Sequence, residues 1–233
     1  MQTQPRLHSN VTQSQRVLRQ LTMVWADFES RLLKVPIVAR AMHQQLRLAD
    51  YLTLISDHYQ QVVEGSGWIS RAASSITAPY LDQRSVFIRH AATEHLDYQM
   101  LEKSYLASGG QKAELIGAHK NIGSEALSAW MYQRASQPNP FDLLGAMFVI
   151  EGLGKRFAQT FANALDENPL ITDPDQLEFY RYHAAHDEDH LQELEDLLAS
   201  SILDITGMDE AIVRTAKVTA RLYLLQLEEL GHY

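Results

Sequence analysis

The chain has 233 residues, of which 45% are hydrophobic and 21% are charged, and this is enough apolar material to close a core without covalent cross-links. It contains no cysteine, which excludes disulfides, thiolate metal sites and cysteine nucleophiles. The formal net charge of −9 argues against a nucleic-acid partner, because binding to phosphates needs clustered lysines and arginines.

The location of the protein is inferred from what the sequence lacks. The N-terminal stretch MQTQPRLHSNVTQSQR is polar and has no apolar segment of the secretory type. No apolar stretch is long enough to span a bilayer. We therefore expect a cytoplasmic protein with no membrane partner, in which residues 1–11 form a flexible tail.

The spacing of apolar residues predicts helices along the whole chain, without the alternation that is typical of strands. Pro36 stands where a helix can begin, the Gly65-Ser-Gly stretch predicts a helix end, and Gly109-Gly110 suits a C-terminal cap. The predicted helices cover approximately residues 12–34, 36–43, 48–63, 82–107, 124–135, 140–165, 175–200 and 209–230. We expect one all-α domain over residues 1–233, a bundle of seven or eight helices whose last member closes the core or joins a homodimer.

The helix predicted over 175–200 contains the sequence HAAHDEDH at residues 183–190. His183, Asp187 and His190 have the spacing i, i+4, i+7, which places them on one face at about 100° per residue. Imidazole nitrogens and carboxylate oxygens that converge from successive helical turns are suitable metal ligands. His186 lies about 60° to one side of this face and Asp189 points further away, so both are weaker candidates.

A second stripe of the same kind lies in the helix predicted over 82–107. His90, Glu94 and Asp97 again have the spacing i, i+4, i+7 and share a face, whereas His95 points about 100° away from Glu94. Two helices that each present three possible ligands on one face favour a metal site more strongly than a single pair of histidines does.

Glu151 is the third contribution, because it follows the apolar run Ala146 to Ile150 and should be at least partly buried. A buried carboxylate needs a cation, a proton or a metal as its partner. Lys155, at i+4, is an alternative partner that would make Glu151 an ordinary ion pair.

The alternative for both stripes is an exposed polar helix face, since aspartate and glutamate favour the surface. The flanking residues argue against it: Phe179 and Leu194 extend the later stripe, and Val86 and Leu101 extend the earlier one. A polar patch within an apolar face is typical of a buried site.

Together, H183-x3-D187-x2-H190, Glu151 and the run LGAMFVIEGLG at 144–154 resemble the haem-oxygenase-like superfamily, in particular its diiron oxidase and oxygenase branch. The TenA and PQQ-synthesis protein C families are neighbouring branches. The resemblance covers approximately residues 48–200 and implies a haem-oxygenase-like helical bundle. It also implies that His183, Asp187, His190 and Glu151 are metal ligands.

The early helix departs from the diiron pattern. Family members with two irons usually have a glutamate followed by a histidine seven residues later, whereas here the order is reversed in His90 and Asp97, with Glu94 between them. The resemblance implies that His183, His190 and Glu151 hold one ion, that Asp187 bridges or completes the set, and that the other three residues hold a second ion.

The other branches can be compared with the sequence in turn. TenA-type thiaminases use a cysteine nucleophile, and this chain has none. Haem oxygenases supply a histidine from the first helix, and Thr22 to Phe28 contains none, so no haem is expected. Metal-free chemistry like that of PQQ-synthesis protein C stays open, with four tyrosines as possible cavity residues: Tyr98, Tyr132, Tyr180 and Tyr182.

The leading hypothesis is therefore a non-haem iron oxidase or oxygenase with one or two irons and a small organic substrate, in a site that manganese or zinc would also fit. The alternative is a metal-free small-molecule binding protein or enzyme with a degenerate metal site. No catalytic residue is assigned. Four residues are candidates for a substrate-cavity wall or, alternatively, for simple core packing: Phe87, Met147, Phe148 and Phe179.

Overall fold

The computed structural model describes residues 12–230, apart from the side chains of residues 187–189. The predicted tail at residues 1–11 lies outside the described residues. Over the described part the chain is helical and has no strand, which confirms the all-α prediction. The α-helices are α1 (Gln13–Leu32), α2 (Pro36–Met42), α3 (Leu48–Ser75), α4 (Leu81–Thr93), α5 (Tyr98–Ala107), α6 (Lys112–Gly117), α7 (Ile122–Ala135), α8 (Leu144–Gly152), α9 (Gln159–Asp166), α10 (Glu178–Leu198) and α11 (Met208–Glu228).

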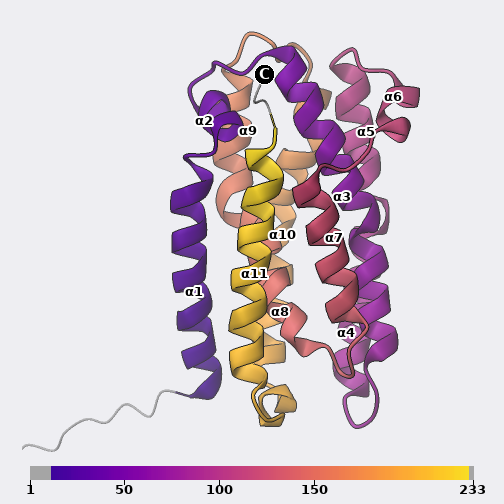
Figure 1. Ribbon diagram of the computed structural model, residues 1–233, viewed down its shortest axis with the longest axis vertical. Coiled ribbons are helices and arrows are strands. Elements are labelled where there is room, and N and C mark those ends of the chain that lie inside the picture. The colour runs from indigo at the N-terminus through magenta and orange to yellow at the C-terminus, as the bar shows by residue number, and fades with distance from the viewer. Residues whose placement is uncertain (1–11, 231–233) are drawn as a thin grey trace, which may run out of the picture.

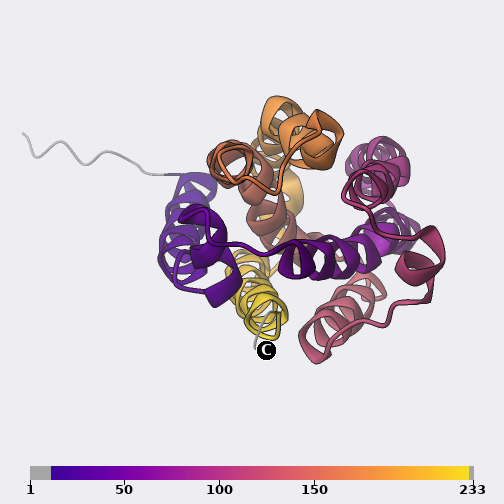
Figure 2. The same ribbon diagram turned by 90° about the horizontal axis from the view of Figure 1, so that it is seen from above.

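The long helices run roughly along one direction and form an elongated bundle, with α11 in front between α1 and α7 (Figure 1). Seen from above, α9 and α10 lie on the side of the bundle opposite α11, and α4 and α5 lie beside α3 (Figure 2). Helix α11 packs against α1, α7 and α8. The last helix thus closes the core, which is one of the two roles that the sequence left open for it.

Helix α3 is longer than predicted, because it continues through Gly65 and Gly67 to Ser75. A glycine inside a helix costs only about 1 kcal/mol relative to alanine. The continued helix buries Trp68 and Ile69, and this burial more than offsets the cost. The predicted end at Gly65 was therefore wrong.

Two predicted helices are each interrupted. A 3₁₀ turn, η1 (Glu94–Leu96), separates α4 from α5, and a π-helical segment, η3 (Leu153–Ala158), separates α8 from α9. Gly109, at φ +88°, follows the end of α5, as expected of a glycine cap. The short helix α6 was not predicted.

Buried apolar side chains from α1 to α11 form one continuous core. Its tightest point is Gly145 of α8, where a Cβ atom would lie 1.9 Å from the backbone oxygen of Ile212 in α11. The absence of a side chain lets the two helices touch at their backbones. Within the described residues, no helix is both long enough and apolar enough to cross a membrane.

Candidate metal centre

The first group of candidate ligands comes from the end of α4 and the turn that follows it. His90 lies in the last turn of α4 and only 3% of it is exposed, while Glu94 begins the 3₁₀ turn and Asp97 directly follows it. A 3₁₀ turn rotates the chain by about 120° per residue instead of about 100°. The extra rotation adds up to about 60° over three residues, yet Glu94 and Asp97 still lie together beside His183.

Glu151 lies near the end of α8, whose neighbouring residues are almost all buried, and it is itself only 6% exposed. The next residue, Gly152, packs against the ring of Trp25: a Cβ atom there would be 2.7 Å from it. This close packing against α1 holds the end of α8 in place. The carboxylate is therefore carried by a rigid part of the core.

Helix α10 supplies His183, which is 8% exposed, and His190, which is partly buried. The two lie seven residues apart and hence on one face of the helix. The side chain of Asp187, predicted as a ligand between them, lies outside the described residues.

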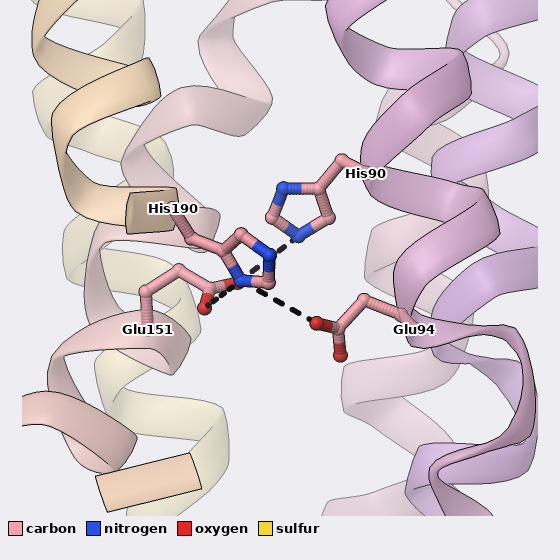
Figure 3. A group of neighbouring side chains, drawn as sticks. All are labelled: His90, Glu94, Glu151 and His190. Atoms are coloured by element: carbon pink, nitrogen blue, oxygen red, sulfur yellow. Dashed lines mark hydrogen bonds and ion pairs between the residues drawn. The ribbon is translucent and has the colours of Figure 1, made fainter. Parts of the chain in front are cut away.

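Glu151 joins the histidines of the two helices (Figure 3). Its Oε1 is 3.2 Å from Nε2 of His90, and its Oε2 is 3.2 Å from Nδ1 of His190. The same Nδ1 is 3.5 Å from Oε1 of Glu94. These four residues offer ligand atoms that all lie within 4.8 Å of one another, and we call them the first ligand group.

A second ligand group consists of Glu94, Asp97 and His183, whose ligand atoms also lie within 4.8 Å of one another. Nε2 of His183 is 3.4 Å from Oδ2 of Asp97. Glu94 belongs to both groups. Six of the seven predicted ligands are thus brought together, and their role as ligands stays a prediction.

The division between the two groups differs from the one that the resemblance implied. His183 and His190 were assigned to one ion, but His190 joins His90 in the first group while His183 joins Asp97 in the second. The two stripes face each other across the interior. Residues at the same level along the bundle axis therefore form a group, even though they come from different helices.

The two glutamates of the first group have pKa values that are shifted in opposite directions. Burial, followed by the charge of Glu151, raises the pKa of Glu94 to about 7. Burial also raises the pKa of Glu151, but the adjoining imidazoles of His190 and His90 more than reverse this and bring it to about 2. Glu151 is therefore ionised at neutral pH, and Glu94 can hold a proton there.

The distances between ligand atoms fit an ion that they would share. Two ligands at about 2.1 Å from one ion, with an angle of about 90–110° between them, are about 3.0–3.4 Å apart. The N···O distances of 3.2, 3.2 and 3.5 Å in the first group are close to this range. Nε2 of His90 is also buried without a hydrogen-bond partner, although Oε1 of Glu151 lies near it. With imidazole and carboxylate donors, the residues fit a divalent ion such as iron.

An internal cavity of about 130 Å³ adjoins both ligand groups, and Glu94, Glu151 and His183 form part of its wall. The rest of the wall is mostly apolar and comes chiefly from α3, η3, α9, α10 and α11, with single residues from α1, α2 and α8. Phe179 lines the cavity as predicted, but Phe87, Met147 and Phe148 do not and pack in the core.

His58 of α3 lines this cavity and was not singled out in the sequence. Its ring contacts that of Phe179 at a centroid distance of 4.9 Å. Burial, assisted by the charge of His183, lowers the pKa of His58 to about 3, so the imidazole is neutral. The only signal was its spacing of four residues from Leu54 and from Val62, which shows a shared helix face but not a cavity.

Of the other polar candidates, some line the cavity and others lie elsewhere. Tyr180 lines the cavity, whereas Tyr132 and Tyr182 are 38% and 42% exposed and Tyr98 packs against Tyr59 instead. The weaker histidine candidates, His95 and His186, are exposed. The described contacts of Glu151 are with histidines, and not the pairing with Lys155 that the sequence left open.

Comparison with known families gives one match. The family described as "iron-containing redox enzyme" matches residues 98–224, which is more than half of the chain. The matched range includes Glu151, His183 and His190, while His90 and Glu94 precede it. Curated protein sequences gave no significant match.

Solved structures share the fold at low sequence identity. A domain of unknown function with a haem-oxygenase-like fold from Shewanella denitrificans OS217 has a TM-score of 0.83 and 15% identity, over 91% of this chain and 90% of that one. A TenA homologue from Pseudomonas syringae pv. tomato DC3000 has a TM-score of 0.70 and 15% identity, over 99% of both chains. A TenA homologue from P. horikoshii OT3 has a TM-score of 0.69 and 14% identity, over 91% of this chain and 96% of that one. The bundle is thus a haem-oxygenase-like fold.

Proposed function

Because this chain belongs to a family of iron-containing redox enzymes, we propose that it is a non-haem iron oxidase or oxygenase acting on a small organic substrate. The observation that carries the proposal is the pair of ligand groups joined by Glu94. We propose that His90, Glu151 and His190 hold one iron, that Asp97 and His183 hold a second, and that Glu94 lies between them. Iron held by such ligands supplies redox chemistry with dioxygen, because imidazole and carboxylate ligands leave coordination positions open.

The protein's own residues would contribute position, charge and exclusion of water. The ligands come from α4, from the turn η1 that follows it, and from α8 and α10, and core packing fixes these helices, so little reorganisation is needed when a cation binds. Glu94, with its pKa of about 7, would release its carboxyl proton when a cation binds, and Glu151 is already ionised. The apolar wall of the cavity limits the access of bulk water to the reacting atoms.

A test is to purify the full chain with ferrous iron and to measure the iron content. We expect about two irons per chain, since the ligand inventory serves two ions. Asp97→Ala and His90→Ala should each retain about one iron, and Glu94→Ala should weaken the binding of both. His95→Ala is the matched control, because that histidine is exposed beside the same ligands. Iron-free wild-type protein, or variants that all bind like the control, would contradict the proposal.

A metal-free small-molecule binding protein or enzyme is the second candidate. The observation that favours it is that the carboxylate of Glu151 has both His90 and His190 as partners without a metal. The two candidates differ in thermal stability, because a ligand bound only by the folded protein raises the melting temperature. Ferrous iron should raise it under the first candidate and leave it unchanged under the second.

A further inference from the structure

The cavity beside the ligand groups is small. Its volume is about 130 Å³, and an apolar protein cavity of roughly 150 Å³ holds one benzene molecule. Glu94, Glu151 and His183 form one part of its wall, so a molecule bound in it would lie next to the proposed iron site. The space therefore admits a compact substrate with about six non-hydrogen atoms.

The charge of the wall restricts the ligand further. Within the described lining residues there is no lysine and no arginine, while two carboxyl groups, those of Glu94 and Glu151, face the same space. Phe157, Phe161 and Phe179 contribute aromatic surface. A free carboxylate or phosphate would lose its hydration here without gaining a cationic partner from the protein.

Among the wall residues, the hydroxyl of Tyr180 and Oε1 of Gln226 lack hydrogen-bond partners within the described part of the chain. The hydroxyl of Tyr180 is buried and has no hydrogen-bond partner, and only 7% of the residue is exposed. The imidazole of His58 lies beside the rings of Phe179 and Tyr180, and the centroid distance to the latter is 6.0 Å. A buried polar group without a partner is unfavourable, so the Tyr180 hydroxyl, with the His58 ring beside it, is suited to receive a polar group of a ligand.

We propose that this cavity is the substrate pocket, and that it takes an uncharged, mostly apolar molecule of about the size of benzene whose one polar group hydrogen-bonds to Tyr180 or His58. This inference rests on the proposed function, because the pocket becomes a substrate site only if iron binds beside it. The pocket would select its substrate by size, by the lack of lysine and arginine among the described lining residues, and by hydrogen bonding to Tyr180 or His58.

The test uses three probes of similar size: phenol, benzene and benzoate. Calorimetric titration of the full chain, with and without ferrous iron in the absence of oxygen, measures their affinities. We expect one site for phenol and for benzene, with phenol bound about three- to tenfold more tightly because it adds one hydrogen bond. In the iron-free protein, benzoate should bind at least about tenfold more weakly than phenol, because its charge has no partner.

Two variants locate the probe. Tyr180→Phe keeps the ring and removes the hydroxyl. The affinity for phenol should therefore fall towards that for benzene, while the affinity for benzene should not change. Tyr98→Phe is the matched control, because Tyr98 does not line the cavity. Ala158→Phe adds a ring to the wall and should abolish the binding of both neutral probes; its melting temperature shows whether it folds.

The outcomes separate the two proposals. If wild-type protein takes up iron but binds neither neutral probe, or if the iron-free form of the same protein binds benzoate as well as phenol, the pocket proposal is wrong and the iron proposal stands. If the neutral probes bind and Ala158→Phe excludes them while no iron is bound, the cavity is a ligand site and the proposed function is wrong. An unchanged phenol affinity in Tyr180→Phe would overturn the role of that hydroxyl.

Discussion

The imidazole rings of His90 and His190 lie with their centroids 4.4 Å apart, and the carboxylate of Glu151 contacts both. The two histidines come from α4 and α10, which lie on different sides of the interior. One carboxylate thus ties together two helices that are far apart in the chain. This relationship makes Glu151 a structural residue of the metal-free protein as well as a proposed ligand.

Replacing Glu151 with glutamine should destabilise the metal-free protein at pH 7. The amide keeps the shape but removes the charge that the imidazoles favour, and we expect a loss of about 1–3 kcal/mol in the free energy of unfolding. The pKa of about 2 is below the ordinary value for glutamate, so this stability is present above about pH 4.5 and is lost as the pH falls towards 2. Urea unfolding in the presence of a chelator measures it. Glu195→Gln, an exposed site on α10, is the control, and equal stability of the two variants would contradict the assignment.

Glu94 should give the metal-free protein the opposite pH dependence. Its folded pKa of about 7 lies above the ordinary value of 4.5, so the folded state holds more protons between these values. Stability should therefore fall as the pH rises from about 4.5 to 7, by roughly 2–3 kcal/mol. Glu94→Gln should remove this fall, while Glu125→Gln, at an exposed position of α7, should preserve it. The measurement is the free energy of unfolding of each variant across this pH range, and a fall that persists in Glu94→Gln would contradict the prediction.

His58 should make the protein sensitive to acid. Its folded pKa of about 3 lies below the ordinary value of 6.5, so the unfolded state takes up the proton first as the pH falls. The stability that this shift provides is complete above pH 6.5 and declines towards pH 3, by roughly 2–4 kcal/mol. His58→Phe should flatten this acid limb, and the slope, not the absolute stability, is the quantity to compare. A slope equal to that of wild-type protein would show that His58 is not the buried titrating group.

Two glycine substitutions should have opposite effects. Gly145→Ala places a Cβ atom against the backbone of α11 and should cost about 1–3 kcal/mol or more, because neither backbone can move aside. Gly65→Ala, inside α3, meets nothing within 4 Å and should stabilise the protein by about 0.5–1 kcal/mol. Thermal melting of both variants checks the pair. A neutral Gly145→Ala would mean that α8 and α11 are not in backbone contact.

The sequence by itself determined the helical class and the two stripes of candidate ligands. Both follow from local periodicity: at 3.6 residues per turn, His90 and Glu94 share a face whatever they pack against, and so do His183 and His190. The 3₁₀ turn at Glu94 rotates the stripe by about 60°, and the three residues still face the ligands of α10. The apolar flanks likewise predicted that the stripes face inward.

The tertiary structure alone decided which residues are neighbours. The pairing of His190 with His90, and of His183 with Asp97, depends on how far α10 is shifted along α4, and no local pattern encodes that shift. The end of α3 was decided by the burial of Trp68 beyond two glycines. The role of His58 depended on a cavity whose walls come from several helices at once. The periodicity of a sequence describes one helix at a time, whereas a pocket forms only when several helices pack together.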